Sequence, residues 1–431
     1  GVYLCYRFEF KGMIRKKKNN TGIITGIDIG SSAIRIAVGQ ESSDMSGKPQ
    51  LQIIATIEVP SEGISKGVIS SIEETVSSIS NALEHIERLT GIPVEHVWIG
   101  MSGMHIISQE SRGVVAIATP HGEIGEDDAE RAIEAARTVA APLNYEVLHV
   151  IPRSFSVDGQ TDIKDPVGMT GIRLEVVTQM IHGATAHIKN VMKAVYRTGV
   201  DIDDLVLSTL ATGDVVATSR QKELGTAVID IGSSTTSVIV YESGDIIHTG
   251  VVPIGSAHVT NDLAIGLRTS IDMAERVKIH YGNCIAKGIS KKDKIRVSTD
   301  DGKEEEFSLQ YVAEIIEARM TEILERVDQE LQLIGRSGLL PAGVMFVGGG
   351  SKIERLIELT KEVLRLPASI GTPINIQGIT EDCHNIAFAP AIGLVRWGAG
   401  VQQGTKKRRI MKMNTGKVIE QFQKLFKSLI P

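Results

Sequence analysis

Apolar positions alternate along most of the chain between the two-residue period of strands and the three-to-four-residue period of helices. Helical spacing is clear in residues 72–86, and residues 186–198 and 309–333 predict two more helices. Further predicted elements are strands at 97–101, 114–118 and 146–151, a helix at 126–140 and an exposed charged turn at 290–306. Strands interleaved with helices predict an α/β fold of parallel strands and flanking helices, with a ligand at the cleft between domains.

One strand–turn–strand pattern occurs twice in nearly the same form. Residues 26–39 read GIDIGSSAIRIAVG, and residues 228–241 read VIDIGSSTTSVIVY. In each copy an apolar run ends at Asp-Ile-Gly-Ser-Ser, and alternating apolar residues follow, which predicts a buried strand, a tight turn and a returning strand. A repeat at this separation indicates two similar halves that face each other.

The turn of each copy has the residue types that hold phosphate. Glycine lets the backbone approach a ligand closely, and the N–H groups and hydroxyls of a turn can point at an anion. Asp28 and Asp230 end the first strands, where each could hold Mg²⁺ through water. The predicted phosphate-binding residues are Gly30, Ser31, Ser32, Gly232, Ser233, Ser234 and Thr235. One copy alone is typical of an ordinary β-hairpin, and the duplication favours a nucleotide clamp.

A third glycine cluster lies late in the chain, where residues 344–351 read VMFVGGGS. The pattern predicts an apolar strand, a glycine turn and then a helix, with Ser351 and Glu354 as a capping box. Glycines at this turn would leave room for a base or ribose against the backbone. A lone run of three glycines is also a common strand-to-helix turn.

Glu275 and Lys278 lie three residues apart on a predicted helix, so they share one face. They could contact ribose hydroxyls and the base, and the alternative is a solvated ion pair. The residues predicted to contact the nucleoside are Glu275, Lys278, Gly348, Gly349, Gly350 and Lys352.

These segments together resemble the phosphate-1, phosphate-2 and adenosine motifs of the actin-like ATPase superfamily, in the same order and separation. Narrower features are similar to the FtsA family of bacterial cell-division proteins: HVIP at residues 149–152, DPVGMTGIRLE at 165–175 and NIAFAPAIGL at 385–394. The resemblance covers roughly residues 21–430.

The resemblance implies an actin-like (ribonuclease H-like) two-domain fold with a nucleotide cleft and inserted subdomains, which binds ATP and Mg²⁺. It also implies self-association into filaments, and anchoring of filaments of the tubulin-like protein FtsZ to the anionic cytoplasmic face of the cell membrane at the division site. The phosphate-2 turn departs from the family, because Ser233 and Ser234 stand where glycine is frequent. Serine adds donors and restricts the backbone, so we expect ATP binding and at most weak hydrolysis.

In the family, the long helix of the second inserted subdomain binds the C-terminal peptide of FtsZ, and residues 314–322 (EIIEARMTE) are similar to that helix. Arg319 and Glu322 share a face there. Arg319 could bind a peptide carboxylate through its forked guanidinium, and Glu322 could pair with a basic residue. An ordinary exposed ion pair is the alternative.

The resemblance also divides the chain into units. The predicted units are an N-terminal extension (1–20), a first actin-like domain (21–94, 175–215 and 384–400), a small subdomain inserted in it (95–174), a second actin-like domain (216–255 and 336–383), an inserted nucleotide and partner subdomain (256–335), a basic linker (401–414) and an amphipathic membrane-targeting helix (415–431).

The last part of the chain differs in character from the rest. Basic residues without apolar periodicity fill 402–414, which is typical of a linker. Apolar residues then form one stripe of a predicted helix: Val418, Ile419, Phe422, Leu425, Phe426, Leu429 and Ile430. Such a stripe can pack on its own domain, but a terminal position after a basic tether favours an interfacial membrane helix.

Composition narrows the function classes. A chain of 431 residues predicts two or more domains, and 42% hydrophobic residues with a mean hydropathy of +0.05 permit sizeable cores. The net charge of −6 argues against a general nucleic-acid binder, and no apolar run approaches the ~20 residues that span a bilayer. Isolated cysteines fit a reducing cytosol, and we expect the natural start at Met13 with residues 1–12 as an upstream extension.

Two other functions fit the superfold. A metabolic phosphotransferase needs a general base, for which the segment before phosphate-2 offers only Thr212 and Asp214, and either could be a capping or surface residue. A pilus-assembly actin relative would not be expected to carry the C-terminal amphipathic helix. The pattern assigns no catalytic residue.

Overall fold

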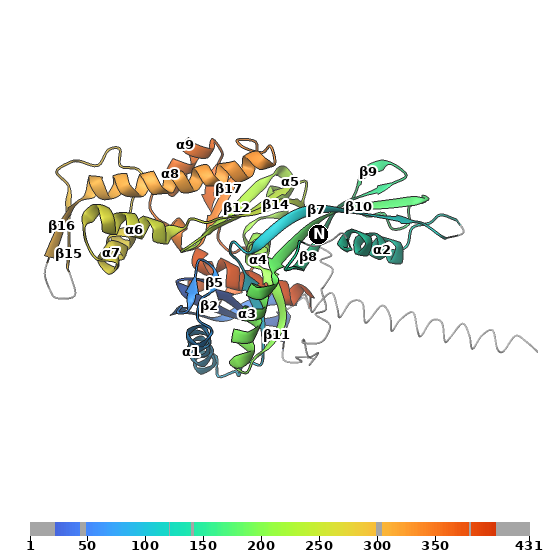
Figure 1. The fold of residues 1–431 in the computed structure, drawn as a ribbon, viewed down its shortest axis with the longest axis horizontal. Coiled ribbons are helices and arrows are strands. Elements are labelled where there is room, and N and C mark those ends of the chain that lie inside the picture. Colours follow the sequence, from blue (N-terminus) through green and yellow to red (C-terminus); the bar gives the residue numbers. More distant parts are fainter. Residues whose placement is uncertain are drawn as a thin grey trace, which may run out of the picture.

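The computed structural model describes residues 22–43, 49–119, 121–138, 142–298, 304–378 and 381–401. Two main β-sheets form the centre, and a separate four-stranded sheet extends from them on one side (Figure 1). On the opposite side, a group of helices ends in a small hairpin (Figure 1). The N-terminal extension, the basic linker and the amphipathic helix predicted for 415–431 lie outside the described residues.

The first main sheet has six strands in the order β11-β6-β1-β2-β3-β19. Its strands are β1 (Ile23–Ile29), β2 (Ala33–Ser43), β3 (Pro49–Pro60), β6 (His96–Met101), β11 (Asp201–Leu207) and β19 (Gln377–Gly378). β1 pairs antiparallel with β2 and parallel with β6, which places the end of β1 in the middle of the sheet. A short hairpin of β4 (Ile64–Ser65) and β5 (Val68–Ile69) follows β3.

Two helices predicted from apolar spacing cover this sheet, α1 (Ile72–Thr90) and α3 (Thr185–Arg197). The Ser71 side chain caps α1 by accepting from the backbone N–H of Glu74, and α1 ends at Gly91 in the left-handed region. Ile79, Leu83 and Ile86 of the predicted stripe are buried. Both helix predictions are therefore confirmed.

The second main sheet has five strands in the order β14-β13-β12-β17-β18. Its strands are β12 (Thr226–Ile231), β13 (Thr236–Glu242), β14 (Asp245–Val252), β17 (Val344–Val347) and β18 (Ala368–Ile370). β12 pairs antiparallel with β13 and parallel with β17, so it repeats the arrangement of β1 in the first sheet. Helices α4 (Ser208–Val216), α5 (Ser219–Leu224) and α9 (Leu356–Leu364) accompany this half.

The separate sheet has the strand order β7-β10-β8-β9. Its elements are β7 (Ile106–Ala116), β8 (Tyr145–Val157), β9 (Gln160–Ile163), β10 (Arg173–Ala184) and helix α2 (Glu126–Arg137). α2 closes a core of its own that includes Ile133, Leu174 and Met180. The strand predicted at 114–118 instead begins at Ile106, because backbone pairing with β10 holds a polar stretch that apolar alternation does not reveal.

Helices and a pair of short strands form the group at the other end of the molecule (Figure 1). They are α6 (Ser256–Leu267), α7 (Ile271–Tyr281), α8 (Leu309–Leu333) and the pair β15 (Lys294–Ser298) and β16 (Glu304–Ser308). The bounds of α8 agree with the prediction. The charged segment predicted as an exposed turn at 290–306 is exposed at most of its described positions, but residues 294–298 and 304–306 belong to paired strands, where Ile295 and Val297 are buried on one face.

Helix α4 joins the two halves. α4 contacts β11 of the first sheet and both β12 and β13 of the second. Three short 3-10 turns are described: Gly349–Lys352, which contacts β12 and β17, Glu381–His384, which contacts β3 and β19, and Ile386–Phe388, which contacts β2. Residues 389–401 then form a helix. Among the described residues, no helix has both the length and the apolar character needed to cross a membrane.

Candidate functional site

The two Gly-Ser-Ser turns close with the same hydrogen bond. The backbone N–H of Gly30 donates to the carbonyl of Ala33 at 3.1 Å, and that of Gly232 donates to the carbonyl of Thr235 at 3.0 Å. The flanking strands also pair in the same antiparallel way. The repeat in the sequence is therefore a repeat of the local structure.

The first turn is fixed from the side by neighbouring backbone. The hydroxyl of Ser31 accepts a hydrogen bond from the N–H of Gly67 at 2.9 Å. The carbonyl of Ser32 accepts one from the N–H of Ser61 at 3.1 Å. Because the Ser31 hydroxyl acts here as an acceptor, its own proton stays available for an anion such as a phosphate oxygen.

The second turn rests on the first turn of α6. The carbonyls of Gly232 and Ser233 accept from the backbone N–H groups of Ser256 at 2.9 Å and Ala257 at 2.8 Å. A Cβ at Gly255 would lie 2.5 Å from the carbonyl oxygen of Ser233, so glycine is needed for this close approach. A displacement of the second turn must therefore also move the start of α6.

Asp28 and Asp230 are the two acids of the site whose pKa values are raised. Asp28 is 9% exposed, and the hydroxyl of Ser208 donates to its Oδ1 at 3.4 Å. Burial raises the pKa of Asp28, while the charge of Arg35 and the Ser208 hydroxyl oppose the shift. Burial and then the charge of Asp28 raise the pKa of Asp230 from an ordinary 3.8 to about 7, against the charge of Arg35. The two carboxyl groups are therefore close enough for the negative charge of Asp28 to disfavour ionisation of Asp230.

This pair of acids fits a magnesium ion that shares its ligands with a nucleotide. Within the part of the chain that the structure describes, no three metal-ligating side chains gather into a complete metal site. Mg²⁺ commonly takes one or two carboxylates and completes its shell with water and substrate phosphates. A divalent cation would also offset the repulsion that raises the pKa of Asp230.

The third glycine cluster packs against the second acid. Gly348 has a φ of +86°, and a Cβ there would lie 2.2 Å from Oδ1 of Asp230. Its N–H donates to the carbonyl of Ile386 at 3.2 Å, which ties this turn to the chain that returns toward the first sheet. Gly349 faces open space instead, since nothing lies within 4 Å of a Cβ placed on it. Lys352 is exposed beside the cluster.

The predicted capping box at this cluster is wrong. α9 begins at Leu356, after Arg355 in the left-handed region, and a 3-10 turn precedes it. The hydroxyl of Ser351 donates to the carbonyl of Val347 at 2.5 Å, so it bonds backward to the strand and caps no helix. The glycines permit a tighter connection than the capping pattern assumes.

Two family models match parts of this chain. The family model described as "Cell division protein FtsA" matches residues 227–393, and that of the "SHS2 domain inserted in FTSA" matches residues 103–182. The chain is 36% identical to the cell division protein FtsA of Pseudomonas aeruginosa, over 87% of this chain and 89% of that protein. It is 36% identical to FtsA of Bacillus subtilis, over 88% of this chain and 84% of that protein. The chain belongs to the FtsA family.

Solved structures confirm the actin-like fold of this FtsA-family chain. A chain of the PilM–PilN type IV pilus biogenesis complex aligns with a TM-score of 0.63 at 17% identity, over 87% of this chain and 98% of that one. MreB5 of Spiroplasma citri bound to ADP aligns with a TM-score of 0.53 at 12% identity, over 91% and 99%. At these identities the likeness concerns the fold alone, and the FtsA relatives carry the role in cell division.

The predicted nucleoside pair, Glu275 and Lys278, lies on α7 and faces α6. The ammonium of Lys278 donates to the hydroxyl of Thr260 at 2.8 Å and pairs with Glu275 at 2.7 Å. The Thr260 hydroxyl in turn donates to Glu275 at 2.5 Å. The two residues form the ion pair of the alternative interpretation, but only Glu275, 44% exposed in its side chain, is solvated, because Lys278 is buried. Contact with ribose or base stays a prediction for the FtsA-family chain.

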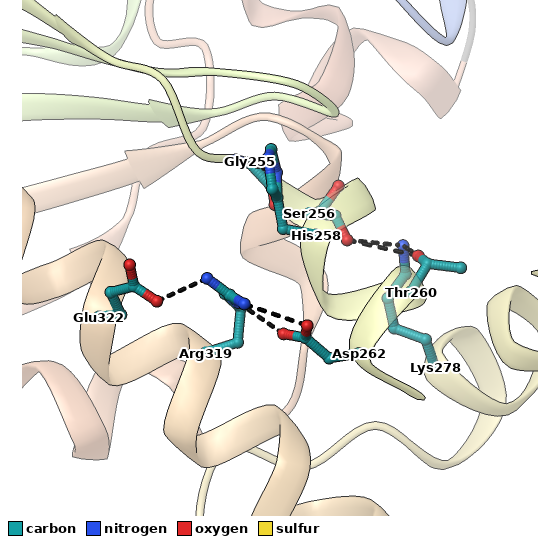
Figure 2. A network of polar contacts seen from close by, with 8 residues as sticks. All are labelled: Gly255, Ser256, His258, Thr260, Asp262, Lys278, Arg319 and Glu322. Atoms are coloured by element: carbon teal, nitrogen blue, oxygen red, sulfur yellow. Dashed lines mark hydrogen bonds and ion pairs between the residues drawn. The ribbon is translucent and has the colours of Figure 1, made fainter. Parts of the chain in front are cut away.

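The predicted partner pair on α8 has a third member that the sequence did not reveal. Arg319 bonds Asp262 of α6 through Nε at 2.5 Å and Nη2 at 3.0 Å, and its Nη1 bonds Glu322 at 2.5 Å (Figure 2). These bonds, that to Asp262 above all, raise the pKa of Arg319. Asp262 lies 57 residues before Arg319, so helical spacing gives no signal for this contact.

Neither predicted candidate for a general base is suited to that role. The hydroxyl of Thr212 is buried and donates to the carbonyl of Ser208 at 2.8 Å. Asp214 lies 3.4 Å from Lys222 and 3.4 Å from Arg396, so its carboxylate is already paired with two cations. The phosphotransferase alternative therefore loses both residues that supported it, which agrees with membership of the FtsA family.

Proposed function

We propose that this chain is an ATP-binding filament protein of cell division, which self-associates at the cytoplasmic membrane and anchors FtsZ filaments there. The duplicated turn carries the proposal: each copy combines a turn closed by the same hydrogen bond with an acid on its first strand whose pKa is raised above the ordinary value by burial first. Mg²⁺ would lie near Asp28 and Asp230. One ATP would then lie between the two turns, with its β- and γ-phosphates on their N–H groups and hydroxyls.

The likeness to MreB5 supports this placement through the fold. One solved MreB5 structure is bound to ADP, and a second, bound to AMPPNP, aligns with a TM-score of 0.50. In the present chain, the base and ribose would meet the side of the second half that holds Glu275, Lys278 and the glycines from Gly348 to Gly350. Lys278 already bonds the helix that supports the second phosphate turn. Nucleoside and phosphate contacts would thus share one rigid support.

Attachment to the membrane is argued from the sequence after residue 401. The seven apolar positions between Val418 and Ile430 form one stripe, and lysines flank it. Each lysine or arginine near an anionic surface contributes about 1 kcal/mol, and burial of the apolar face adds about 25 cal/mol per Å². A single short helix therefore binds reversibly, and self-association into filaments multiplies weak anchors into firm attachment.

FtsZ would bind at α8 through Arg319 and Glu322. A guanidinium fork matches the two oxygens of a carboxylate, which a peptide with acidic side chains or a free C-terminus supplies. Glu322, 39% exposed in its side chain, is accessible to a basic residue of the same peptide.

Co-sedimentation with anionic liposomes tests the proposed function as a whole. The full chain should pellet with liposomes, and pellet more fully when Mg²⁺-ATP promotes filaments. A chain that ends at Gly400 should stay in the supernatant under both conditions while still binding ATP. Pelleting of the shortened chain to the same extent as the full chain would refute the membrane anchor.

A further inference from the structure

Helix α6 connects the second phosphate turn to the predicted partner residue. At its start, the backbone N–H groups of Ser256 and Ala257 bond the carbonyls of Gly232 and Ser233. Further along the same helix, Asp262 bonds Arg319 of α8 (Figure 2). Ser256 and Asp262 lie six residues apart, so about 9 Å of continuous helix separates the two contacts.

The first half of α6 is also fixed to α7. Lys278 donates to the carbonyl of Ser256 at 3.4 Å and to the hydroxyl of Thr260 at 2.8 Å. Figure 2 shows these bonds on one side of α6 and the Arg319 pair on another. α6 is thus joined to the phosphate turn, to α7 and to α8 by polar bonds, and its turns move together.

Asp262 occupies the atoms of Arg319 that a partner would need. Nε and Nη2, one edge of the guanidinium fork, hold the two oxygens of Asp262 at 2.5 and 3.0 Å. The side chains of Arg319 and Asp262 are 24% and 28% exposed, so water and a peptide can reach the pair. If a peptide carboxylate displaces Asp262 from Arg319, Arg319 exchanges one pair of charged hydrogen bonds for another. The displaced Asp262 carboxylate remains accessible to water, so no buried charge is left without a partner.

We propose that Asp262 is an internal competitor for the acidic peptide that binds Arg319, and that α6 makes this competition depend on the nucleotide. Binding of Mg²⁺-ATP at the second turn shifts the start of α6, the helix carries the shift to Asp262, and Arg319 is released for the peptide. This inference rests on the proposed function, because it takes Arg319 as the peptide site and the second turn as a phosphate site.

Peptide affinity in an Asp262→Asn variant tests the inference. The probe is a fluorescein-labelled peptide of the FtsZ C-terminus, titrated by anisotropy with and without Mg²⁺-ATP. Asparagine keeps the shape and removes the charge, so without nucleotide the variant should bind about three- to five-fold more tightly than wild type, as expected for loss of a partly exposed ion pair. Mg²⁺-ATP should tighten binding to wild type and leave the variant unchanged.

Matched controls separate this effect from a general change of charge or stability. Asp272→Asn makes the same change at an exposed position of α7 and should behave as wild type. Asp262→Ala repeats the test with the polar group removed, and melting temperatures verify that each variant is folded.

The outcomes distinguish the inference from the proposal on which it rests. Equal peptide affinity in wild type and Asp262→Asn, or an equal effect of ATP on both, overturns the competition and leaves the Arg319 site standing. If neither protein binds the peptide while both bind Mg²⁺-ATP, the peptide site fails and the competition fails with it. If neither binds Mg²⁺-ATP, the nucleotide site itself is wrong, and with it the control of Asp262 by α6.

Discussion

Replacing Asp230 with asparagine removes one of two acids that repel each other beside the Gly-Ser-Ser turns. Burial and the charge of Asp28 raise the pKa of Asp230 from 3.8 to about 7. At pH 8 that difference corresponds to about 4 kcal/mol of unfavourable ionisation in the folded chain. Asparagine keeps the size of the side chain and carries no charge, so it avoids this ionisation energy. The variant should therefore be more stable than wild type in the absence of metal and nucleotide.

The sign of the pH dependence follows from the raised pKa. Between pH 3.8 and about 7 the folded chain binds more protons at Asp230 than the unfolded chain does. Stability from this group is therefore fully present below pH 3.8 and is lost as the pH rises through about 7. The advantage of Asp230→Asn over wild type should be near zero at pH 4, grow up to pH 7 and then level off.

Thermal unfolding at several pH values, with a chelator and no nucleotide, measures this difference. Average unfolding entropies convert about 4 kcal/mol into a rise of about 4 °C for a chain of this length. Asp127→Asn, at an exposed position of α2, is the control and should change little. Mg²⁺-ATP should stabilise wild type more than Asp230→Asn, because the variant lacks one of the two carboxylates proposed to hold the metal. An equal or lower melting temperature for Asp230→Asn at pH 8 would refute the electrostatic account.

Three further changes test other parts of the account. Gly348→Ala places a methyl group 2.2 Å from Oδ1 of Asp230 at a φ of +86°. The change should therefore weaken Mg²⁺-ATP binding about tenfold and lower the melting temperature. Wild-type affinity of this variant in calorimetry would contradict that packing. Arg319→Glu should abolish binding of the FtsZ peptide in anisotropy and leave ATP binding intact, whereas Arg326→Glu, an exposed change on the same helix, should do neither. Phe426→Glu should move the chain from anionic liposomes to the supernatant at unchanged melting temperature, and a fall of roughly 4 °C or more with membrane binding retained would place that helix in the globular body.

Local patterns predicted the parts of the fold that depend on local chemistry. The duplicated turn was predictable because both copies need the same residues for the same bond, and α8 was predictable because one long apolar stripe spans it. The hairpin at 294–308 had a usable signal, since Lys294, Ile295, Arg296 and Val297 alternate between exposed and buried. Its high charge masked that alternation.

Contacts between distant segments could not be predicted in the same way. Asp262 contacts Arg319, and Ser208 contacts Asp28, only because the chain packs elements from distant segments together. Much of β7 is polar and is held in the sheet by backbone pairing with β10. Because its side chains do not alternate between apolar and polar, apolar periodicity could not predict this strand. The start of α9 was misjudged because glycines allowed a 3-10 turn where a capping pattern favoured a helix.

Calorimetric titration of Mg²⁺-ATP tests the central claim most directly, that the paired turns and their acids form one nucleotide site. Wild type and the Asp127→Ala control should bind with the same affinity. Asp28→Ala and Asp230→Ala should each bind about tenfold more weakly or worse, because each would remove a carboxylate from the proposed Mg²⁺ site. Unchanged affinity in both Asp28→Ala and Asp230→Ala would contradict the clamp.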